Sequence, residues 1–154
     1  IDNQTPYLFF ACGGGQRMFE STIALANMTR TTLAINELKN NNLPYIVCFT
    51  DPTAGGITAS FAMLGDIHLA EPGCLIAFAG KRVIQATVKE ELSSDFQTAE
   101  FVEKHGFVDR VVHRKDIQKE VGNLLSILLR KNSDIHLENL NETSETNIQT
   151  REAS

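Results

Sequence analysis

The chain has 154 residues and a formal net charge of −5 at pH 7, and 42% of its residues are hydrophobic. This length suits one domain or part of one, and the apolar fraction is enough for a buried core. A mildly acidic chain with 7% aromatic residues and no Trp is a poor candidate for a general nucleic-acid binder, so we expect no DNA binding. Because no apolar run reaches the roughly 18 residues of a membrane span, we also expect no transmembrane segment.

The elements predicted along the chain alternate between strands and helices. Short apolar runs bounded by Gly, Pro and Asn predict strands, at residues 7–11, 45–50, 67–70, 75–78 and 108–112. Apolar residues at helical spacing predict helices, at 17–40, 57–64, 82–92, 98–105 and 115–131. The apolar face of the first helix is formed by Leu25, Met28, Ile35 and Leu38, and that of the last by Ile117, Val121, Leu124, Leu125 and Leu128. Such an alternation indicates an α/β layered fold.

The last part of the chain differs in composition from the rest. Residues 132–154 contain five acidic residues and one Arg, together with many Asn, Thr and Ser residues and no apolar period. A segment of this kind cannot bury enough apolar surface to become ordered. We therefore predict a folded region at 1–131 and a disordered acidic tail at 132–154.

Cysteine and histidine residues give no sign of a metal site. Cys12, Cys48 and Cys74 are far apart and form no CxxC pair, so we predict buried, reduced thiols. The four histidines have no HxxxH spacing, and the adjacent Glu90 and Glu91 would not face one site together.

Two glycine clusters mark the most informative part of the sequence. Gly13, Gly14 and Gly15 follow the first predicted strand, and Gly55 and Gly56 follow the second. Glycine allows close approach of a ligand to the backbone, and a following helix directs free N–H groups toward an anion. The Lys-Ser/Thr of a Walker A loop and the GxGxxG fingerprint are both absent, which leaves an oxyanion or enolate hole. The alternative is that both clusters are tight turns without a catalytic role.

Other residues near these clusters have two interpretations each. Ser60 is either a nucleophile or a packing residue, and none of His68, His105, His113 and His136 lies in a context that suggests a base for it. Arg17, Lys81 and Arg82 border the glycine-rich regions. They could contact the phosphates of a nucleotide-bearing substrate or form ordinary surface salt bridges.

Four strings in this chain, in this order, resemble a known family. They are GGGQRMFES, LPYIVCFTDPTAGGITASFAMLGDIHLAEPG, IAFAGKRVI and FQTAEFVEKHGFVDRVVHR. They are similar to the carboxyltransferase β subunit of the multi-subunit acetyl-CoA carboxylase of bacteria and plastids, from about Tyr7 to Arg130. The resemblance implies a crotonase-like (ClpP/crotonase) α/β fold of repeated ββα units, which is incomplete in this chain.

The resemblance also implies a reaction and a set of site residues. The carboxyl group of carboxybiotin passes to the methyl carbon of acetyl-CoA to give malonyl-CoA for fatty acid synthesis, and backbone N–H groups stabilise the enolate. The oxyanion pair falls on Gly14 and Gly15. Substrate-binding positions fall on the remaining matched residues, Gly55, Gly56, Phe78, Gly80, Lys81 and Arg82, with Arg17 nearby. The chain departs from the family at Gln16, where Ala is usual, and at Lys81, where Pro is usual.

Partners follow from the same resemblance. The active site of the family lies between the α and β subunits, and the β subunit normally begins with a four-cysteine zinc ribbon. We therefore expect the chain to be the C-terminal portion of β, made separately or cleaved, with zinc only on the missing N-terminal half. The expected partners are that zinc-ribbon half, the carboxyltransferase α subunit, the biotin carboxyl carrier protein and biotin carboxylase. Abundant Asn, Ile and Lys favour the plastid stroma as the location, with a bacterial cytoplasm as the alternative.

Three other functions stay open from the sequence. A crotonase-like acyl-CoA hydratase or isomerase would need a carboxylate, for which Glu20 and Glu71 are the candidates near the glycine motifs. A serine peptidase of the same broad fold would use Ser60. A non-catalytic assembly subunit would tolerate the departures at Gln16 and Lys81.

Overall fold

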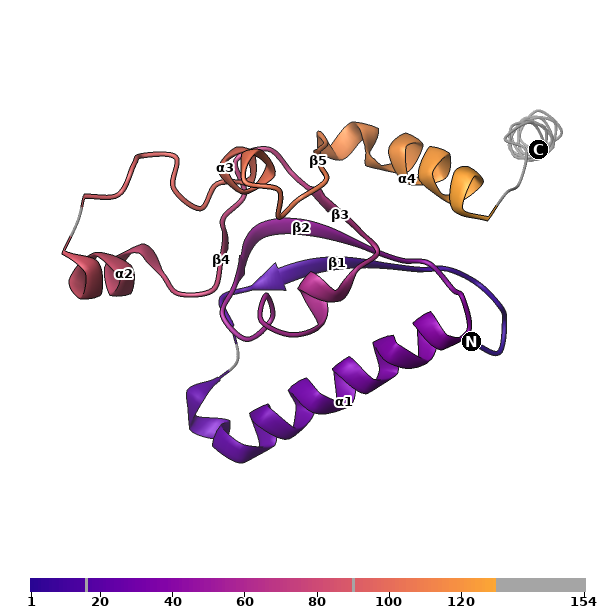
Figure 1. Cartoon of the computed structure of the whole chain (residues 1–154), viewed down its shortest axis with the longest axis horizontal. Helices are drawn as coiled ribbons and strands as arrows, with labels where there is room; N and C mark the ends of the chain where they lie inside the picture. Colours follow the sequence, from indigo (N-terminus) through magenta and orange to yellow (C-terminus); the bar gives the residue numbers. More distant parts are fainter. Residues whose placement is uncertain (16, 90, 130–154) are drawn as a thin grey trace, which may run out of the picture. The chain divides into compact units, whose positions relative to one another are not determined.

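The structure is a computed structural model that describes residues 1–15, 17–89 and 91–129 (Figure 1). The chain divides into two compact units, Ile1–Ile117 and Gln118–Ser154. The first unit contains the sheet and every predicted site residue. The tail predicted at 132–154 and the departure at Gln16 lie outside the described residues.

A parallel sheet forms the centre of the first unit, as the strand–helix alternation predicts. Its order is β1-β2-β3-β5, and β4 pairs with the far end of β2. The strands are β1 (Tyr7–Gly13), β2 (Tyr45–Ala54), β3 (Ile67–Ala70), β4 (Ile76–Ala77) and β5 (Arg110–Val111). All five predicted strands are confirmed, and β2 is longer than predicted because its last residues pair with β4.

The helices include two short 3-10 turns that the sequence pattern did not predict. In chain order they are η1 (Met18–Glu20), α1 (Ser21–Asn40), η2 (Phe61–Leu64), α2 (Lys81–Val88), α3 (Ala99–Lys104) and α4 (Arg114–Leu128). Figure 1 shows α1 running along one side of β1 and β2, with α2 at the far end of the unit. No helix in the described ranges is both long and apolar enough to cross a membrane.

The prediction of a helix at 57–64 is wrong. The chain makes turns after Gly56 and only then enters the 3-10 turn η2. The Ser60 hydroxyl donates to the Gly56 carbonyl at 2.5 Å, which offers the backbone an alternative to helix hydrogen bonding. The β-branched side chains of Ile57 and Thr58 further disfavour a helix at this point.

The long helix was placed correctly, but its start and its apolar face differ from the prediction. The α-helix begins at Ser21, after η1, rather than at Arg17. Ala24 and Ile35 are buried, whereas Leu25 is 64% exposed. In α4, Ile117 and Val121 are buried as expected, but Leu128 is 42% exposed.

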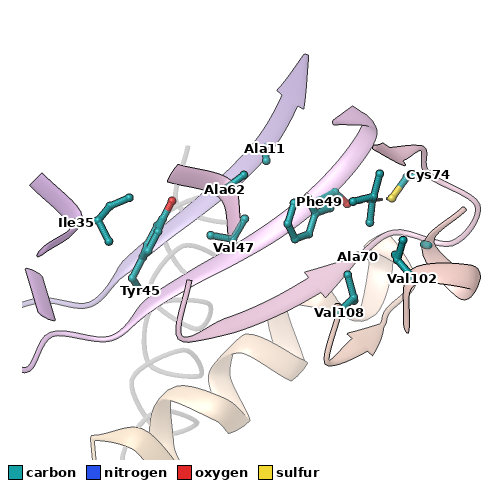
Figure 2. Close-up of a cluster of buried hydrophobic side chains, with 12 residues drawn as sticks. Ala11, Ile35, Tyr45, Val47, Phe49, Ala62, Ala70, Cys74, Val102 and Val108 are labelled. Atoms are coloured by element: carbon teal, nitrogen blue, oxygen red, sulfur yellow. Dashed lines mark hydrogen bonds between the residues drawn. The ribbon is translucent and has the colours of Figure 1, made fainter. Parts of the chain in front are cut away.

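Alternate residues of β2 form the centre of the core. Tyr45, Val47 and Phe49 are each at most 1% exposed and, as expected for a strand, share one face of the sheet. In Figure 2 they lie in one row, with Ile35 of α1 near one end and Cys74 near the other. This core fixes β2 against β1 and therefore fixes the position of the loops that follow both strands.

The cysteine prediction is confirmed at two of three positions. Cys48 and Cys74 are free and buried, and burial raises the pKa of Cys48 to about 11 and that of Cys74 to about 12. Both thiols are therefore protonated and unreactive at neutral pH. Cys12 is free but exposed, because it lies at the end of an edge strand.

Candidate active site

The two glycine clusters lie in direct contact at one edge of the sheet. Strands β1 and β2 are parallel neighbours, so the segments that follow them leave the sheet at the same edge. Gly13, the first residue of the first cluster, is paired in the ladder with Thr53, two residues before the second cluster. The structure therefore brings together two sequence motifs that are 40 residues apart.

The two backbones approach each other closely, and the approach is tightest at Gly55. A Cβ atom added to Gly55 would lie 3.1 Å from the Gly15 Cα, and one added to Gly15 would lie 3.4 Å from the Gly55 Cα. Gly15 has φ +116° and Gly55 has φ +62°, which other residues rarely adopt. A Cβ added to Gly13 would lie 2.6 Å from the Ile57 Cδ1 atom. Gly55 is therefore required by both its contact and its backbone conformation and Gly15 by its conformation, whereas a side chain at Gly13 would meet only the end of the flexible Ile57 side chain.

Gly14 is different, because the packing of the described chain does not require a glycine there. It is exposed, its φ is not positive, and a Cβ built on it would meet no atom within 4 Å. Within the described ranges, neither the Gly14 nor the Gly15 N–H donates a hydrogen bond. Two consecutive amides with no hydrogen-bond acceptor of their own could bind an anionic oxygen.

The second cluster packs against the first, and its Gly55 N–H is already hydrogen-bonded and so is not available to a ligand. The Gly55 N–H lies 3.1 Å from both the Ala77 and the Phe78 carbonyl oxygens. The Asp51 carboxylate accepts a hydrogen bond from the Leu75 N–H at 2.9 Å. Through these contacts the segment around β4 is held against the loop that backs Gly15.

A bulge in β2 carries this loop past β1. Ala11 pairs with Phe49, but the next pair is Gly13 with Thr53, so β2 has two extra residues at this point. The Ala11 carbonyl accepts hydrogen bonds from the hydroxyls of Thr50 and Thr53, each at 2.8 Å. These two hydroxyls satisfy the Ala11 carbonyl at the point where the bulge interrupts the regular backbone hydrogen bonds.

The helix expected after each cluster does not direct its first turn at the glycines as predicted. The first cluster is followed by η1, and α1 begins six residues after Gly15, with Glu20 at its N-cap and no side-chain cap. The second cluster is followed by turns. The polarity of the site therefore comes from individual amides rather than from a helix N-terminus.

The predicted substrate-binding residues are brought together only in part. Phe78 contacts Gly55 through its carbonyl group, and its side chain is 69% exposed. Gly80 is the N-cap of α2, and the Lys81 ammonium donates to the Ser94 carbonyl at 3.1 Å. Arg17 pairs at 4.0 Å with Glu20, and Arg82 is exposed on α2.

The side chains that could carry alternative chemistry have structural roles. Ser60 is buried and hydrogen-bonded to Gly56. His68, the histidine nearest to Ser60 along the chain, lies against Asp109, and its backbone N–H donates to the Asp109 carboxylate at 2.7 Å. Burial lowers the pKa of His68, and the Asp109 carboxylate opposes this effect. No hydrogen bond joins Ser60 to a histidine within the described ranges.

Glu71 is also committed to a structural contact. Its two carboxylate oxygens accept from the Arg114 guanidinium, one of them at 2.8 Å. These hydrogen bonds hold the pKa of Glu71 below its ordinary value. A carboxylate in this state is poorly suited to move protons as a general acid or base at neutral pH. Among the described residues, no group of three or more His, Cys, Asp or Glu could hold a metal ion.

Gln97 contacts the segment of the predicted substrate-binding residues, although it was not itself among the predicted site residues. It is 6% exposed, and its side-chain Nε2 donates to the Ala79 carbonyl at 2.7 Å. A single Gln between a Phe and a Thr carries no signal in the sequence of burial or of a long-range contact. Its role becomes visible only from the fold.

Sequence comparison gives relatives that cover most of this chain. It is 68% identical over 145 residues, 94% of its length, to "Acetyl-coenzyme A carboxylase carboxyl transferase subunit beta" of Pelagibacter ubique, and covers 47% of that protein. It is 55% identical over 84% of its length to the protein of the same name from Caulobacter vibrioides, and covers 42% of it. The chain thus spans about half the length of the curated relatives it matches. No profile of a known protein family matches it.

Solved structures share the fold. The match to transcarboxylase 12S covers 80% of this chain and 24% of the transcarboxylase chain, with a TM-score of 0.69 and 24% sequence identity. The match to one chain of the Pseudomonas malonate decarboxylase MdcD-MdcE hetero-dimer covers 87% of this chain and 61% of that one, with a TM-score of 0.63 and 18% sequence identity. The match to an enoyl-CoA hydratase/carnithine racemase from Magnetospirillum magneticum covers 80% of this chain and 57% of the matched chain, with a TM-score of 0.50 and 16% sequence identity.

These findings confirm the resemblance described from the sequence and the crotonase-like fold. Both relatives reported are bacterial, so the expected plastid origin is not supported. The bacterial alternative fits them.

Proposed function

We propose that this chain is part of a carboxyltransferase β subunit of acetyl-CoA carboxylase, to one of which it is 68% identical, and that it binds acetyl-CoA and stabilises its enolate during carboxyl transfer. The carboxyl group of carboxybiotin then passes to the methyl carbon, and malonyl-CoA is formed. The observation that supports this proposal is the pair of amides at Gly14 and Gly15, which donate no hydrogen bond among the described residues and lie against Gly55.

The chemistry requires stabilisation of negative charge on the thioester oxygen. The ureido nitrogen of biotin, once its carboxyl group has left, would accept the proton of the methyl carbon. Charge then moves to the thioester oxygen, and two fixed N–H donors stabilise it more than they stabilise the uncharged substrate. The amides need not reorganise during the reaction, because the close contact of Gly15 with Gly55 already fixes them. Removing one such donor typically slows catalysis about 10²–10³-fold.

The described residues favour this backbone mechanism over a carboxylate mechanism. Glu71 is held by Arg114, and the Glu20 carboxylate lies 4.0 Å from Arg17. The Ser60 hydroxyl donates a hydrogen bond to the Gly56 carbonyl. Of the three side chains that the sequence offered for the hydratase, isomerase and peptidase alternatives, Glu71 and Ser60 are therefore committed to structural contacts, and Glu20 is an exposed residue beside Arg17.

The segment after β4 would bind the nucleotide end of the substrate. Lys81 and Arg82 lie at the first turn of α2, directly after Phe78 and Gly80, and Arg17 follows the first glycine cluster. Lysine and arginine are suited to CoA phosphates. The Lys81 ammonium would then share its hydrogens between Ser94 and a phosphate oxygen.

Partners would complete the site. β1 is an edge strand whose Leu8 and Phe10 side chains are 37% and 50% exposed, and such an edge is usually covered. We assign its cover to the N-terminal zinc-ribbon half of the β subunit, where the zinc would also lie. The α subunit would supply the second half of the active site. Biotin carboxylase and the biotin carboxyl carrier protein would deliver carboxybiotin, in a bacterial cytoplasm.

A structure of the assembled complex with a non-reactive acetyl-CoA analogue tests the proposal. We expect the thioester oxygen within about 3 Å of the Gly14 and Gly15 nitrogens. A thioester bound elsewhere in the complex would contradict the role of these glycines. Co-purification provides an independent check, because the chain should isolate with a zinc-ribbon protein and an α-type carboxyltransferase subunit.

A further inference from the structure

Gln97 occupies an unusual position two residues before α3, where its backbone is hydrogen-bonded to β4. Its φ is +68°, in the left-handed region that non-glycine residues rarely adopt, yet its side chain is almost completely buried. Its Oε1 atom is buried and has no hydrogen-bond partner among the described residues. A buried polar group with an unpaired acceptor and a strained backbone requires an explanation.

The explanation lies in the other end of the same amide. Nε2 donates to the Ala79 carbonyl at 2.7 Å, and the Gln97 carbonyl accepts from the Ile76 N–H at 2.9 Å. Because a carbonyl oxygen is only an acceptor, the NH₂ group must face Ala79 and the side-chain oxygen is left over. The residue is therefore placed to donate to one carbonyl.

That carbonyl lies in the middle of the segment that connects the two parts of the proposed site. Immediately before it, the Ala77 and Phe78 carbonyls accept from the Gly55 N–H. Immediately after it, Gly80 begins α2, and its carbonyl accepts from the Val83 and Ile84 N–H groups. Fixing Ala79 therefore fixes the start of α2 relative to the glycine clusters.

We propose that Gln97 is a positioning residue: its side-chain amide holds the Ala79 carbonyl and thereby sets the distance between the glycine amides and the cationic first turn of α2. This inference rests on the proposed acyl-CoA function. Gln97 contacts no substrate, so its loss affects binding of acetyl-CoA more than the chemical step. The amides of Gly14 and Gly15 keep their own support from Gly55.

The test uses the assembled complex and two variants of matched size. Gln97→Met removes the donor, and we expect the KM for acetyl-CoA to rise about tenfold, equivalent to about 1.4 kcal/mol, with kcat within twofold of wild type. Gln97→Glu places a carboxyl group against the Ala79 carbonyl. This group donates only when protonated, so we expect its KM defect to shrink as the pH is lowered from 8.5 to 6.

Two controls separate positioning from general destabilisation. Thr98→Ala removes the hydroxyl that caps α3, where Oγ1 accepts from the Phe101 N–H at 3.3 Å, and should lower the melting temperature without changing the KM. Gln118→Met, at an exposed position of α4, should change neither. A KM for Gln97→Met within twofold of wild type, or an equal rise in Thr98→Ala, would overturn the proposal.

Amide hydrogen exchange gives a readout that does not depend on activity. In Gln97→Met the Gly55 amide should exchange faster than in wild type and in Thr98→Ala, because its acceptors at Ala77 and Phe78 become mobile. Unchanged exchange at Gly55 would refute the positioning role. A wild-type complex that forms no malonyl-CoA would instead refute the proposed function, while the exchange measurement would still decide the role of Gln97.

Discussion

Replacing Gly14 or Gly15 by Ala should separate the catalytic role of the first glycine cluster from its packing role. Gly14 is exposed, and an added Cβ would meet no atom within 4 Å. We therefore expect Gly14→Ala to change the free energy of unfolding by no more than about 0.5 kcal/mol. Its methyl group, between the two free amides, would occupy the space proposed for the thioester oxygen.

The magnitude of the activity loss follows from the two donors at stake. Displacing the oxygen from one amide is expected to lower kcat for malonyl-CoA formation about 10²–10³-fold, or roughly 3–4 kcal/mol. Gly15→Ala should lose activity as well, but for a different reason. With φ +116° and the Gly55 Cα 3.4 Å from the new Cβ, it should also lose about 1–3 kcal/mol of stability.

Urea unfolding and a coupled assay of malonyl-CoA formation, both on the assembled complex, measure the two effects. Gly122→Ala is the matched control, because a Cβ there would also meet no atom within 4 Å and the residue lies within α4, in the second compact unit. It should retain full activity. If Gly14→Ala forms malonyl-CoA at the wild-type rate, the amides of Gly14 and Gly15 are not the oxyanion donors.

Three further variants test the side chains assigned structural roles. Ser60→Ala should keep full carboxyl-transfer activity and lose about 1 kcal/mol of stability with its hydrogen bond to Gly56, whereas a large loss of rate with normal folding would favour a nucleophile. Because Arg114 holds the pKa of Glu71 below its ordinary value, stability from this pair is present above pH 4.5 and is lost as the pH falls through the folded-state pKa. Arg114→Met should therefore melt below wild type at pH 7 and approach it in acid, and parallel melting curves at all pH values would contradict this. Since burial lowers the pKa of His68 from 6.5, its contribution is complete above pH 6.5 and declines below it. His68→Gln should flatten the loss of stability between pH 7 and 5 in urea titrations, and an unchanged slope would count against it.

The sheet was predictable because its signals are local. The runs at Tyr7 and Tyr45 are apolar, β-rich and bounded by turn residues, and both became neighbouring parallel strands. The prediction of a helix at 57–64 was wrong because the apolar residues of this segment also fit helical spacing. The hydrogen bond from the Ser60 hydroxyl to the Gly56 carbonyl competes with a helix, and it depends on a turn that hydrophobic periodicity does not describe. Leu25 has helical spacing but is exposed in this chain, since periodicity cannot show whether a partner lies opposite that face.

For the candidate site, too, the local features could be predicted from the sequence and the long-range contacts could not. The glycines at Gly14 and Gly55 could be found from composition and from their place after strands. That Gly15 and Gly55 touch could not, because this depends on a two-residue bulge in β2. The hydrogen bond from Gln97 to Ala79 spans 18 residues, and nothing in the two strings that contain these residues indicates that they are in contact.

A site made of backbone amides depends on register more than on side-chain identity. The amides of Gly14 and Gly15 point where the end of β1 directs them, and that end is fixed by the pairing of Gly13 with Thr53. A one-residue slip would reverse which face each residue presents. Thr53 is fully buried, and its hydroxyl lies 2.8 Å from the Ala11 carbonyl, so it stabilises the register at the point where the ladder is interrupted. The substitutions that damage this site most are therefore expected to include residues that never contact the substrate.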